Sequence, residues 1–165
     1  MKPNEQIIEE FYSGFASNNS VTMNSCYHPE VVFQDPVFGV LQSQDVRDMW
    51  EMLIFKSNGR LDIKFSNVVA IANTGSVNWV AQYVFSSTGR KVQNVIHAQF
   101  EFKNGLIYRH IDTFNLYHWS KQALGIKGTL LGWTPFFKRK IQQQALQSLR
   151  NFQQKKKSNT YNTAP

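Results

Sequence analysis

The sequence predicts an α+β domain, because segments with helical spacing come first and segments typical of strands follow. Apolar side chains recur every three or four positions over residues 5–15 and 43–57. Four later segments are rich in Val, Ile, Phe, Tyr and Trp, and short turn sequences separate them. Helices followed by an antiparallel meander give a sheet with helices packed on one face.

Three helices are expected before the meander. The first begins after Asn4, which is a suitable N-cap, and the second follows Ser20 and ends at His28-Pro29. The third covers residues 43–57 and ends at Asn58-Gly59. Between the second and third helices, residues 31–33 predict a brief strand, and Asp35-Pro36 opens a turn.

The meander is expected to contain four strands, at residues 61–71, 76–86, 90–102 and 106–115. Asn and Gly residues in the intervening segments are typical of hairpin turns. Such a sheet is strongly twisted, so it can leave a cavity between its concave face and the helices. A chain of 165 residues is long enough to form this as one domain with a sizeable core.

The last predicted strand carries an acid and a base on a face that should be apolar. Side chains alternate along a strand, so Tyr108, His110, Asp112 and Phe114 share one side. A titratable pair between aromatic residues is either a structural hydrogen-bonded couple or the floor of a reactive pocket. Both interpretations remain open at the level of the sequence.

Two motifs resemble those of a known family. They are F-x-D-P-V-F-G at residues 33–39 and G-x-I-x-x-H-x-D-x-F at residues 105–114. With the order of elements, they resemble the nuclear transport factor 2-like superfamily and, within it, the SnoaL-like polyketide cyclase and ketosteroid isomerase group, over residues 5–115. The resemblance implies a cone-shaped half-barrel whose pocket is lined by the concave sheet and capped by helices.

The resemblance also implies roles for two carboxyl groups. Asp35 falls at the position of the proton-shuttling base of ketosteroid isomerases. Asp112 falls where SnoaL-like cyclases and limonene-epoxide-type hydrolases have a catalytic acid or base. The match is incomplete, because Ala98 stands nearest the position of the isomerases' protonated Asp, and residues 82–84 and 97–99 lack the Arg-x-Asp pair of the hydrolases.

These observations give a candidate acid–base site for a small hydrophobic carbonyl compound, with Asp112, His110 and Asp35 as catalytic residues. Burial disfavours the ionised form of a carboxyl group and raises its pKa toward the range that suits proton abstraction. An isomerase, cyclase or hydratase that needs no cofactor fits this set. The alternative is a non-catalytic module that binds an apolar ligand or dimerises. Candidate ligand-binding residues are Tyr12, Trp50, Trp79, Tyr83, Ala98, Tyr108 and Phe114.

Other site classes lack the expected motifs. The four histidines have no H-E-x-x-H spacing, and the single cysteine, Cys26, excludes C-x-x-C, so no metal site is expected. Glycine-rich phosphate loops and dinucleotide fingerprints are absent from the sequence as well. One cysteine cannot form an intramolecular disulfide, and together with the lack of an apolar leader this predicts a cytoplasmic protein.

Charge divides the chain into two parts. Residues 1–115 carry nine Lys or Arg against eleven Asp or Glu, whereas residues 116–165 carry nine Lys or Arg and no acid. The first part is the predicted cone domain. Residues 116–152 predict a basic extension, with a glycine-punctuated loop at 125–135 and then an amphipathic helix, and residues 153–165 predict a flexible tail.

The amphipathic helix of this extension has three candidate partners. Packing on the domain or on a second subunit of a homodimer is favoured, because the apolar stripe has about the width that one packed helix buries. Contact with an anionic membrane surface comes second. Nucleic acid is not expected, because a few clustered charges without a reading motif are weak evidence for it.

Overall fold

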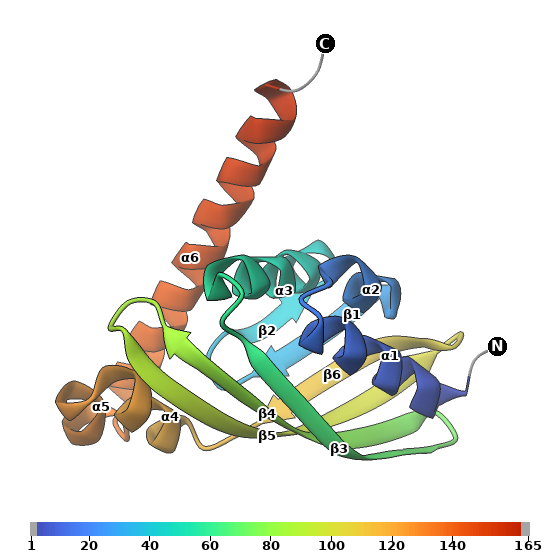
Figure 1. Ribbon diagram of the computed structural model, residues 1–165, viewed down its shortest axis with the longest axis horizontal. Coiled ribbons are helices and arrows are strands. Elements are labelled where there is room, and N and C mark those ends of the chain that lie inside the picture. Colours follow the sequence, from blue (N-terminus) through green and yellow to red (C-terminus); the bar gives the residue numbers. More distant parts are fainter. Residues whose placement is uncertain (1–2, 163–165) are drawn as a thin grey trace.

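A single curved sheet of six strands with helices on one face forms the body of the protein (Figure 1). The structure is a computed structural model that describes residues 3–162. It confirms the predicted α+β class. The helices are α1 Asn4–Ala16, α2 Ser20–Ser25, α3 Gln44–Ser57, α4 Leu116–Leu124, α5 Ile126–Leu131 and α6 Pro135–Asn162. The strands are β1 Tyr27–Asp35, β2 Gly39–Gln42, β3 Asp62–Ile71, β4 Thr74–Phe85, β5 Arg90–Lys103 and β6 Leu106–Thr113.

The sheet is mixed rather than fully antiparallel. Its strand order is β2-β1-β6-β5-β4-β3, so the predicted meander forms the β3 to β6 half. β1 pairs in parallel with β6, and β2 pairs antiparallel with β1 at the edge. The sequence predicted β1 only as a short isolated strand and did not predict β2. The parallel pairing matters most for the site, because it joins the D-P motif to the H-x-D motif.

The core lies between the inner face of the sheet and helices α1 and α3. Along β5 buried and exposed residues alternate without interruption from Val92 to Phe102, as a strand with one covered face requires. Phe11, Tyr12 and Trp50 are among the largest fully buried side chains, and they reach the sheet from α1 and α3. The apolar interior is therefore strongly aromatic on both sides.

An irregularity in β6 places Tyr108 on a different side of the sheet from the one predicted. The register between β5 and β6 shifts between Phe102, which pairs with Ile107, and Glu101, which pairs with Arg109. Tyr108 is the extra residue in this interval, and an inserted residue shifts the alternation of side chains. Ile107 is consequently buried on the inner side together with His110, whereas Tyr108 lies beneath the Lys103 ammonium group, which is 5.0 Å from its ring centroid.

The first two helices differ from prediction at their ends. Pro3 rather than Asn4 precedes the first helical residue, and the Asn4 amide instead donates to the carbonyl of Ala72 at 2.7 Å. Helix α2 ends at Ser25, so Tyr27 starts β1 instead of lying on the helix. This places the Tyr27 side chain in the core beside the sheet.

The C-terminal extension is almost entirely helical. α4 packs on the β4–β5 hairpin, where Thr88 donates to the Ala123 carbonyl at 2.6 Å. The predicted loop at 125–135 contains helix α5, and α6 continues through residue 162 where a flexible tail was predicted. Residues 163–165 of that tail lie outside the described part. Figure 1 shows α6 starting near α5, crossing behind α3 and projecting beyond the body.

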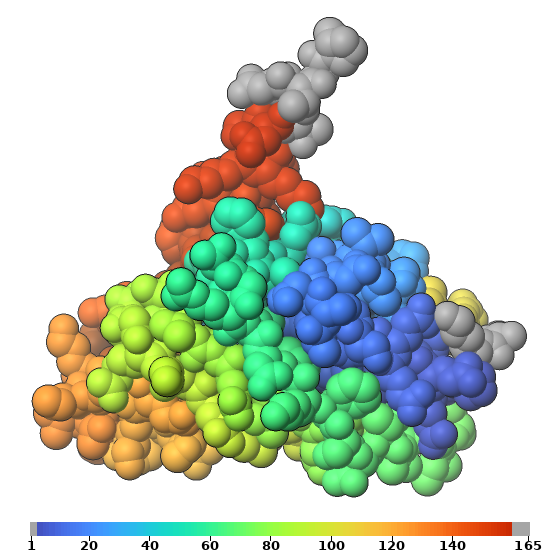
Figure 2. All heavy atoms as spheres, viewed as in Figure 1, coloured from blue at the N-terminus to red at the C-terminus, as the bar shows by residue number. Residues whose placement is uncertain are grey.

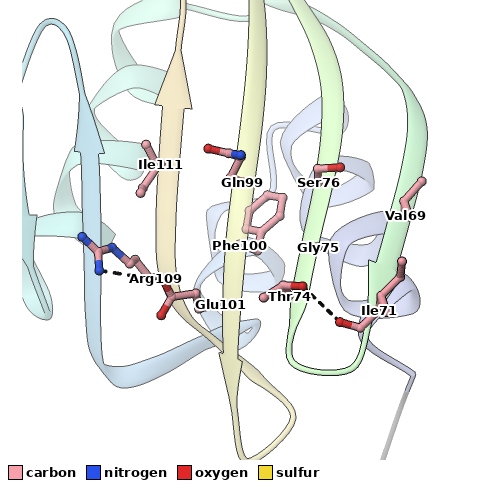
Figure 3. A pocket seen from close by; sticks show the side chains of 10 residues that line it. All are labelled: Val69, Ile71, Thr74, Gly75, Ser76, Gln99, Phe100, Glu101, Arg109 and Ile111. Atoms are coloured by element: carbon pink, nitrogen blue, oxygen red, sulfur yellow. Dashed lines mark hydrogen bonds and ion pairs between the residues drawn. The ribbon is translucent and has the colours of Figure 1, made fainter.

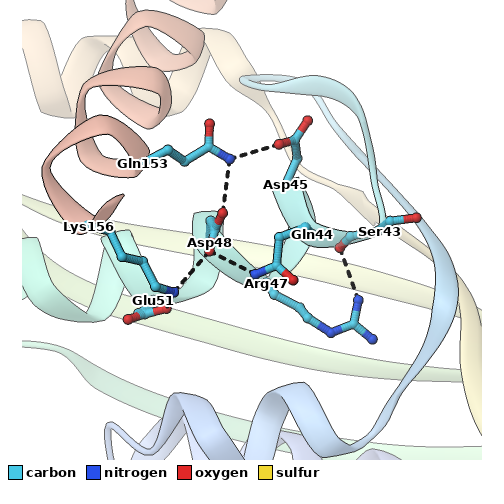
Figure 4. Close-up of polar contacts among 8 residues, drawn as sticks. All are labelled: Ser43, Gln44, Asp45, Arg47, Asp48, Glu51, Gln153 and Lys156. Atoms are coloured by element: carbon cyan, nitrogen blue, oxygen red, sulfur yellow. Dashed lines mark hydrogen bonds and ion pairs between the residues drawn. The ribbon is translucent and has the colours of Figure 1, made fainter. Parts of the chain in front are cut away.

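Polar contacts fasten α6 to α3 (Figure 4). Asp48 on α3 is buried and accepts from the side chains of Gln44 at 3.0 Å, Gln153 at 3.0 Å and Lys156 at 3.1 Å. Burial acts to raise the pKa of Asp48, but these hydrogen bonds and the charge of Lys156 outweigh it and hold the pKa below its usual value. The ionised carboxylate therefore contributes to holding α6 in place.

Replacing Asp48→Asn is expected to lower the free energy of unfolding by about 1 kcal/mol at neutral pH, because a charged and hydrogen-bonded acceptor becomes neutral. A folded-state pKa that is depressed gives stability that is present above the unfolded value of about 3.9 and is lost as pH falls through the folded value. The difference between wild type and variant should thus vanish in acid. Urea unfolding at several pH values measures it.

Asp62→Asn is the matched control, since the Asp62 side chain is 56% exposed and its ion pair with Lys64 is long, at 3.8 Å. That variant should change stability by less than about 0.5 kcal/mol. Equal effects of the two substitutions would contradict the assignment of Asp48 as the fastening carboxylate.

Candidate functional site

A cavity of about 530 Å³ lies between the inner face of the sheet and the helices. Its size falls within the roughly 300–1,000 Å³ of small-molecule sites. The carboxyl groups in its lining belong to Asp35 and Asp112, and Tyr83 adds a phenol. The rest of the lining is largely apolar and aromatic, and it includes Phe15, Phe33, Met49, Trp50, Leu53, Trp79, Phe114, Trp119 and Ile141.

The parallel pairing of β1 with β6 brings the two carboxyl groups together. Phe33 pairs with His110 and Gln34 pairs with Ile111. One step further along both strands sets Asp35 beside Asp112, on the same face as the preceding inward pair. Two residues that are 77 positions apart in the sequence are therefore neighbours across the strands.

A chain of buried hydrogen bonds ends on the Asp112 carboxyl group. The indole of Trp50 donates to the Tyr27 hydroxyl at 2.8 Å, and this hydroxyl lies 2.7 Å from Nδ1 of His110. Nε2 of His110 lies 3.0 Å from Oδ1 of Asp112, which also accepts from the Trp79 indole at 3.3 Å. The chain draws on α3, β1, β6 and β4.

The chemistry of the two ends fixes the direction of this chain. An indole N–H can only donate and a carboxylate can only accept. With Asp112 as a carboxylate and His110 as a neutral ring, the assigned hydrogen is on Nε2 and points at Asp112, and Nδ1 accepts from the Tyr27 hydroxyl. Every donor in the chain points toward Asp112, which is the arrangement that stabilises negative charge on its oxygen.

His110 contacts Asp112 but does not line the cavity. Its side chain is fully buried, it stacks on Trp50 at 5.9 Å between ring centroids, and it is absent from the lining. Both of its ring nitrogens are occupied by Tyr27 and Asp112. Of the three predicted catalytic residues, Asp112 and Asp35 line the cavity, and His110 contacts it only through Asp112.

Asp35 is held at the turn between β1 and β2. Its Oδ1 accepts from the backbone N–H groups of Val37 at 2.9 Å and Phe38 at 2.5 Å. Burial raises the pKa of Asp35 to about 7, and the nearby charge of Asp112 adds to the rise, while the turn N–H groups act in the opposite sense. The two adjacent carboxyl groups consequently occupy unlike environments on one cavity wall.

Tyr83 supplies the third polar group of interest. Its hydroxyl accepts from the Trp119 indole at 2.8 Å, which joins β4 to α4. Burial raises the pKa of Tyr83, and the charge of Asp35 also raises it. The phenol therefore keeps its hydrogen near neutral pH and has it available to donate to a ligand.

The predicted ligand-binding residues fall into three groups. Trp50, Trp79, Tyr83 and Phe114 line the cavity. Tyr12 and Ala98 are fully buried behind it and do not appear in the lining. Tyr108 stands outside, because the irregularity in β6 turns it toward Lys103 and the ring of His28, whose centroid is 5.5 Å away.

Sequence reasoning missed several residues that shape the site. Tyr27 was expected on a helix, and no local pattern indicates a hydrogen bond to a residue 83 positions later. Trp119 lines the cavity from α4, and Ile141, Gln144 and Ala145 line it from α6. The stripe of apolar residues on α6 is a usable signal, since an apolar stripe faces the surface on which a helix packs.

A second depression lies on the face of the sheet turned away from the helices (Figure 3). Its volume is about 380 Å³, and its most strongly charged contact is a partly exposed ion pair between Arg109 and Glu101 at 3.8 Å. Both side chains lie near half exposure, where an ion pair contributes little. This depression offers less for chemistry than the inner cavity.

Within residues 3–162, no group of three or more His, Cys, Asp or Glu is arranged to hold a metal ion. Cys26 is buried, and its thiol donates to the carbonyl oxygen of Thr22 at 3.3 Å.

The chain belongs to the SnoaL-like family. The family model for the SnoaL-like domain matches residues 8–110, which is more than half of the chain. This segment contains most of α1, all of α2 and α3, and the sheet up to His110, so it includes Asp35. It ends before Asp112 and the helical extension. A comparison with curated protein sequences found no significant match.

Solved structures share the fold at low sequence identity. TerC, crystallised with polyporic acid, has a TM-score of 0.64 and 15% identity, covering 74% of this chain and 98% of its own. An epoxide hydrolase of the LEH-like type from M. tuberculosis has values of 0.58 and 16%, covering 78% and 96%. A protein with a ketosteroid isomerase-like fold from Catenulispora acidiphila, in complex with trimethylamine, has 0.61 and 10%, covering 79% and 98%. These neighbours confirm the nuclear transport factor 2-like cone fold.

Two tyrosines test the hydrogen-bond chain. Tyr27→Phe should lower the free energy of unfolding by about 1–3 kcal/mol, because the buried Trp50 N–H and His110 Nδ1 lose their common partner. Tyr12→Phe is the matched control, since its hydroxyl is equally buried but lacks a hydrogen-bond partner within the described chain. It should be neutral or stabilising. Denaturant unfolding of both variants measures the contrast, and equal losses would contradict it.

The raised pKa of Asp35 predicts a pH dependence of stability. A carboxyl group with a folded pKa of about 7 favours the folded state fully below the unfolded value of about 3.9. That contribution is lost as pH rises through about 7. Wild type should lose stability relative to Asp35→Asn between pH 4 and pH 7, as measured by thermal unfolding. Parallel curves for the two proteins would contradict the shift.

Proposed function

We propose that this protein catalyses proton transfer on a small hydrophobic carbonyl compound without a cofactor, as an isomerase or cyclase. The observation that carries the proposal is the pair of adjacent carboxyl groups, Asp35 and Asp112, in unlike environments on one apolar cavity. Unlike environments give the two carboxyl groups different pKa values. One of them can then act as the base while the other keeps a different protonation state.

Asp35 is the proposed base. A group with a pKa of about 7 is ionised in about half of the molecules at neutral pH and still binds a proton well, which is the best compromise for general base catalysis. Its carboxylate takes a proton from the carbon next to the substrate carbonyl, and the electron pair of that C–H bond moves toward the carbonyl oxygen. Returning the proton to another carbon completes an isomerisation.

Tyr83 is the proposed donor to the carbonyl oxygen, where negative charge develops. Its hydroxyl accepts from Trp119, and a donor that itself accepts a hydrogen bond donates more strongly. This role replaces the protonated Asp of ketosteroid isomerases, whose expected position is occupied by Ala98. Asp112 supports Asp35 through its charge, which helps to raise the pKa of that base.

The structural neighbours are consistent with a small organic ligand. TerC was crystallised with polyporic acid, and another neighbour is an LEH-like epoxide hydrolase. Their identity to this chain is at most 16%, so they support the cone fold and leave the reaction to be argued from the cavity.

A non-catalytic role in binding an apolar ligand is the second candidate. It is favoured by one observation: both nitrogens of His110 and one oxygen of Asp35 are already committed to internal hydrogen bonds. In that case the polar groups order the core, and the cavity holds a ligand without turnover.

Hydrogen–deuterium exchange separates these two functions. The protein is incubated in D₂O with a panel of hydrophobic ketones, and loss of the signal from hydrogens next to the carbonyl is followed by ¹H NMR. Wild type should accelerate exchange for at least one ketone, with a rate that rises with pH and levels off above about 7 as Asp35 ionises. Asp35→Asn should reduce the rate at least about a hundredfold.

Asp45→Asn serves as the control, because this exposed carboxyl group on α3 lies outside the cavity. It should retain the wild-type rate. Binding of ketones by wild type without any exchange above the control would contradict the catalytic proposal and leave the binding function.

A further inference from the structure

Five large apolar side chains are exposed together in α5 and at the start of α6. Figure 2 shows this part of the chain, in orange, protruding at one end of the molecule. We call these five residues the apolar tip. They are Ile126 at 79% exposure, Leu130 at 65%, Leu131 at 49%, Trp133 at 66% and Phe136 at 69%. The family model ends before them, at residue 110, so they lie outside the matched segment.

The apolar tip is built on fixed backbone. Gly128 and Gly132 pack so closely against Ser120 of α4 that a Cβ atom at either position would collide with it. The Tyr117 hydroxyl donates to the carbonyl of Thr129 at 3.1 Å, which also ties α5 to α4. The exposed side chains are therefore held by packed helices. Their contact with water is unfavourable in free energy.

Positive charge surrounds the apolar tip. Residues 116–165 contain nine Lys or Arg and no acid. Five of these cations lie in or beside α4, α5 and the first turn of α6, and all five are exposed: Lys121, Lys127, Lys138, Arg139 and Lys140. Large apolar and aromatic side chains flanked by Lys and Arg match a surface with anionic headgroups above hydrocarbon.

We propose that the apolar tip docks this protein on an anionic phospholipid bilayer as a peripheral protein. Within residues 3–162 no helix is both long and apolar enough to cross a bilayer. The five apolar side chains would insert at the level of the headgroups, which removes them from water. The flanking Lys and Arg side chains would contact the lipid phosphates.

A second copy of the chain fits this surface less well. A two-fold dimer brings the same patch of both subunits together, so the five cations of one copy would face the five of the other. Like charges brought together in this way repel, and the extension contains no acid to compensate them. Charge complementarity therefore selects the anionic bilayer.

Helix α4 lies between the apolar tip and the cavity. Trp119 and Leu124 of α4 line the cavity, while the Ser120 hydroxyl of the same helix donates to the Gly128 carbonyl of α5. Docking at the tip would thus set the cavity close to a source of hydrophobic compounds. The docking itself stands on exposure and charge and does not depend on the proposed reaction.

Tryptophan fluorescence offers a direct test, because Trp133 is exposed while Trp50, Trp79 and Trp119 are buried. The full chain is titrated with phosphatidylcholine vesicles that contain or lack phosphatidylglycerol. Vesicles with phosphatidylglycerol should shift the emission to shorter wavelength and protect it from acrylamide, and co-sedimentation should show bound protein. Binding to phosphatidylcholine alone should be weaker by roughly a hundredfold, since the electrostatic part is missing.

Variants separate the apolar and charged contributions. Leu130→Ser with Phe136→Ser should abolish sedimentation with vesicles, and replacing Lys138, Arg139 and Lys140 by Gln should weaken it roughly a hundredfold. Val21→Ser is the matched control, because Val21 is 78% exposed on α2, away from the extension. It should bind like wild type, and circular dichroism should confirm that all variants are folded.

Two results would overturn the proposal. One is equal sedimentation of wild type with vesicles that contain or lack phosphatidylglycerol, or no sedimentation with either. The other is a dimer in analytical ultracentrifugation that Leu130→Ser with Phe136→Ser dissociates, since this outcome assigns the apolar tip to a second copy of the chain. Neither result bears on hydrogen exchange in the cavity, so the two proposals fail separately.

Discussion

The site depends on one constraint, the parallel pairing of β1 with β6. This pairing sets Tyr27 opposite Ile107, from where its hydroxyl reaches Nδ1 of His110 at 2.7 Å, and it places Asp35 beside Asp112 at the other end. The inner hydrogen bonds run in one direction because an indole must donate at the start and a carboxylate must accept at the end. A core in which these groups were unpaired would leave several buried donors unsatisfied, so the same contacts that stabilise the fold also fix the orientation of Asp112.

The helical extension contributes part of the cavity lining. Trp119 from α4 and Ile141 and Ala145 from α6 line the cavity that also contains Asp35 and Asp112. Burial is the main cause of the raised pKa of Asp35. The contacts of Asp48 with Gln153 and Lys156 hold α6 against α3 (Figure 4). The extension therefore contributes to the shape of the site.

Sequence patterns predicted the parts of this structure that follow from local periodicity. The meander, the long helices, and the facing of His110 and Asp112 all follow from spacing along the chain. The irregularity that turns Tyr108 outward was not predictable, because an inserted residue in a strand leaves no mark on composition. Propensity does not encode the parallel pairing of β1 with β6, nor the hydrogen bond of Tyr27 to a residue 83 positions later. The glycines of residues 125–135 indicate a loop, but Gly128 and Gly132 instead allow helix α5 to pack closely against Ser120.

The position of the hydrogen on His110 tests the central claim most directly. In the directed chain the hydrogen is on Nε2, facing Asp112, while Nδ1 accepts from Tyr27. Long-range ¹H–¹⁵N correlation spectra of protein labelled with ¹⁵N-histidine report which ring nitrogen carries hydrogen, and His110→Gln identifies the resonances. We predict that this hydrogen is on Nε2 and that Nδ1 carries none in the neutral ring. A hydrogen on Nδ1 would contradict the account, because the donors would then no longer all point toward Asp112.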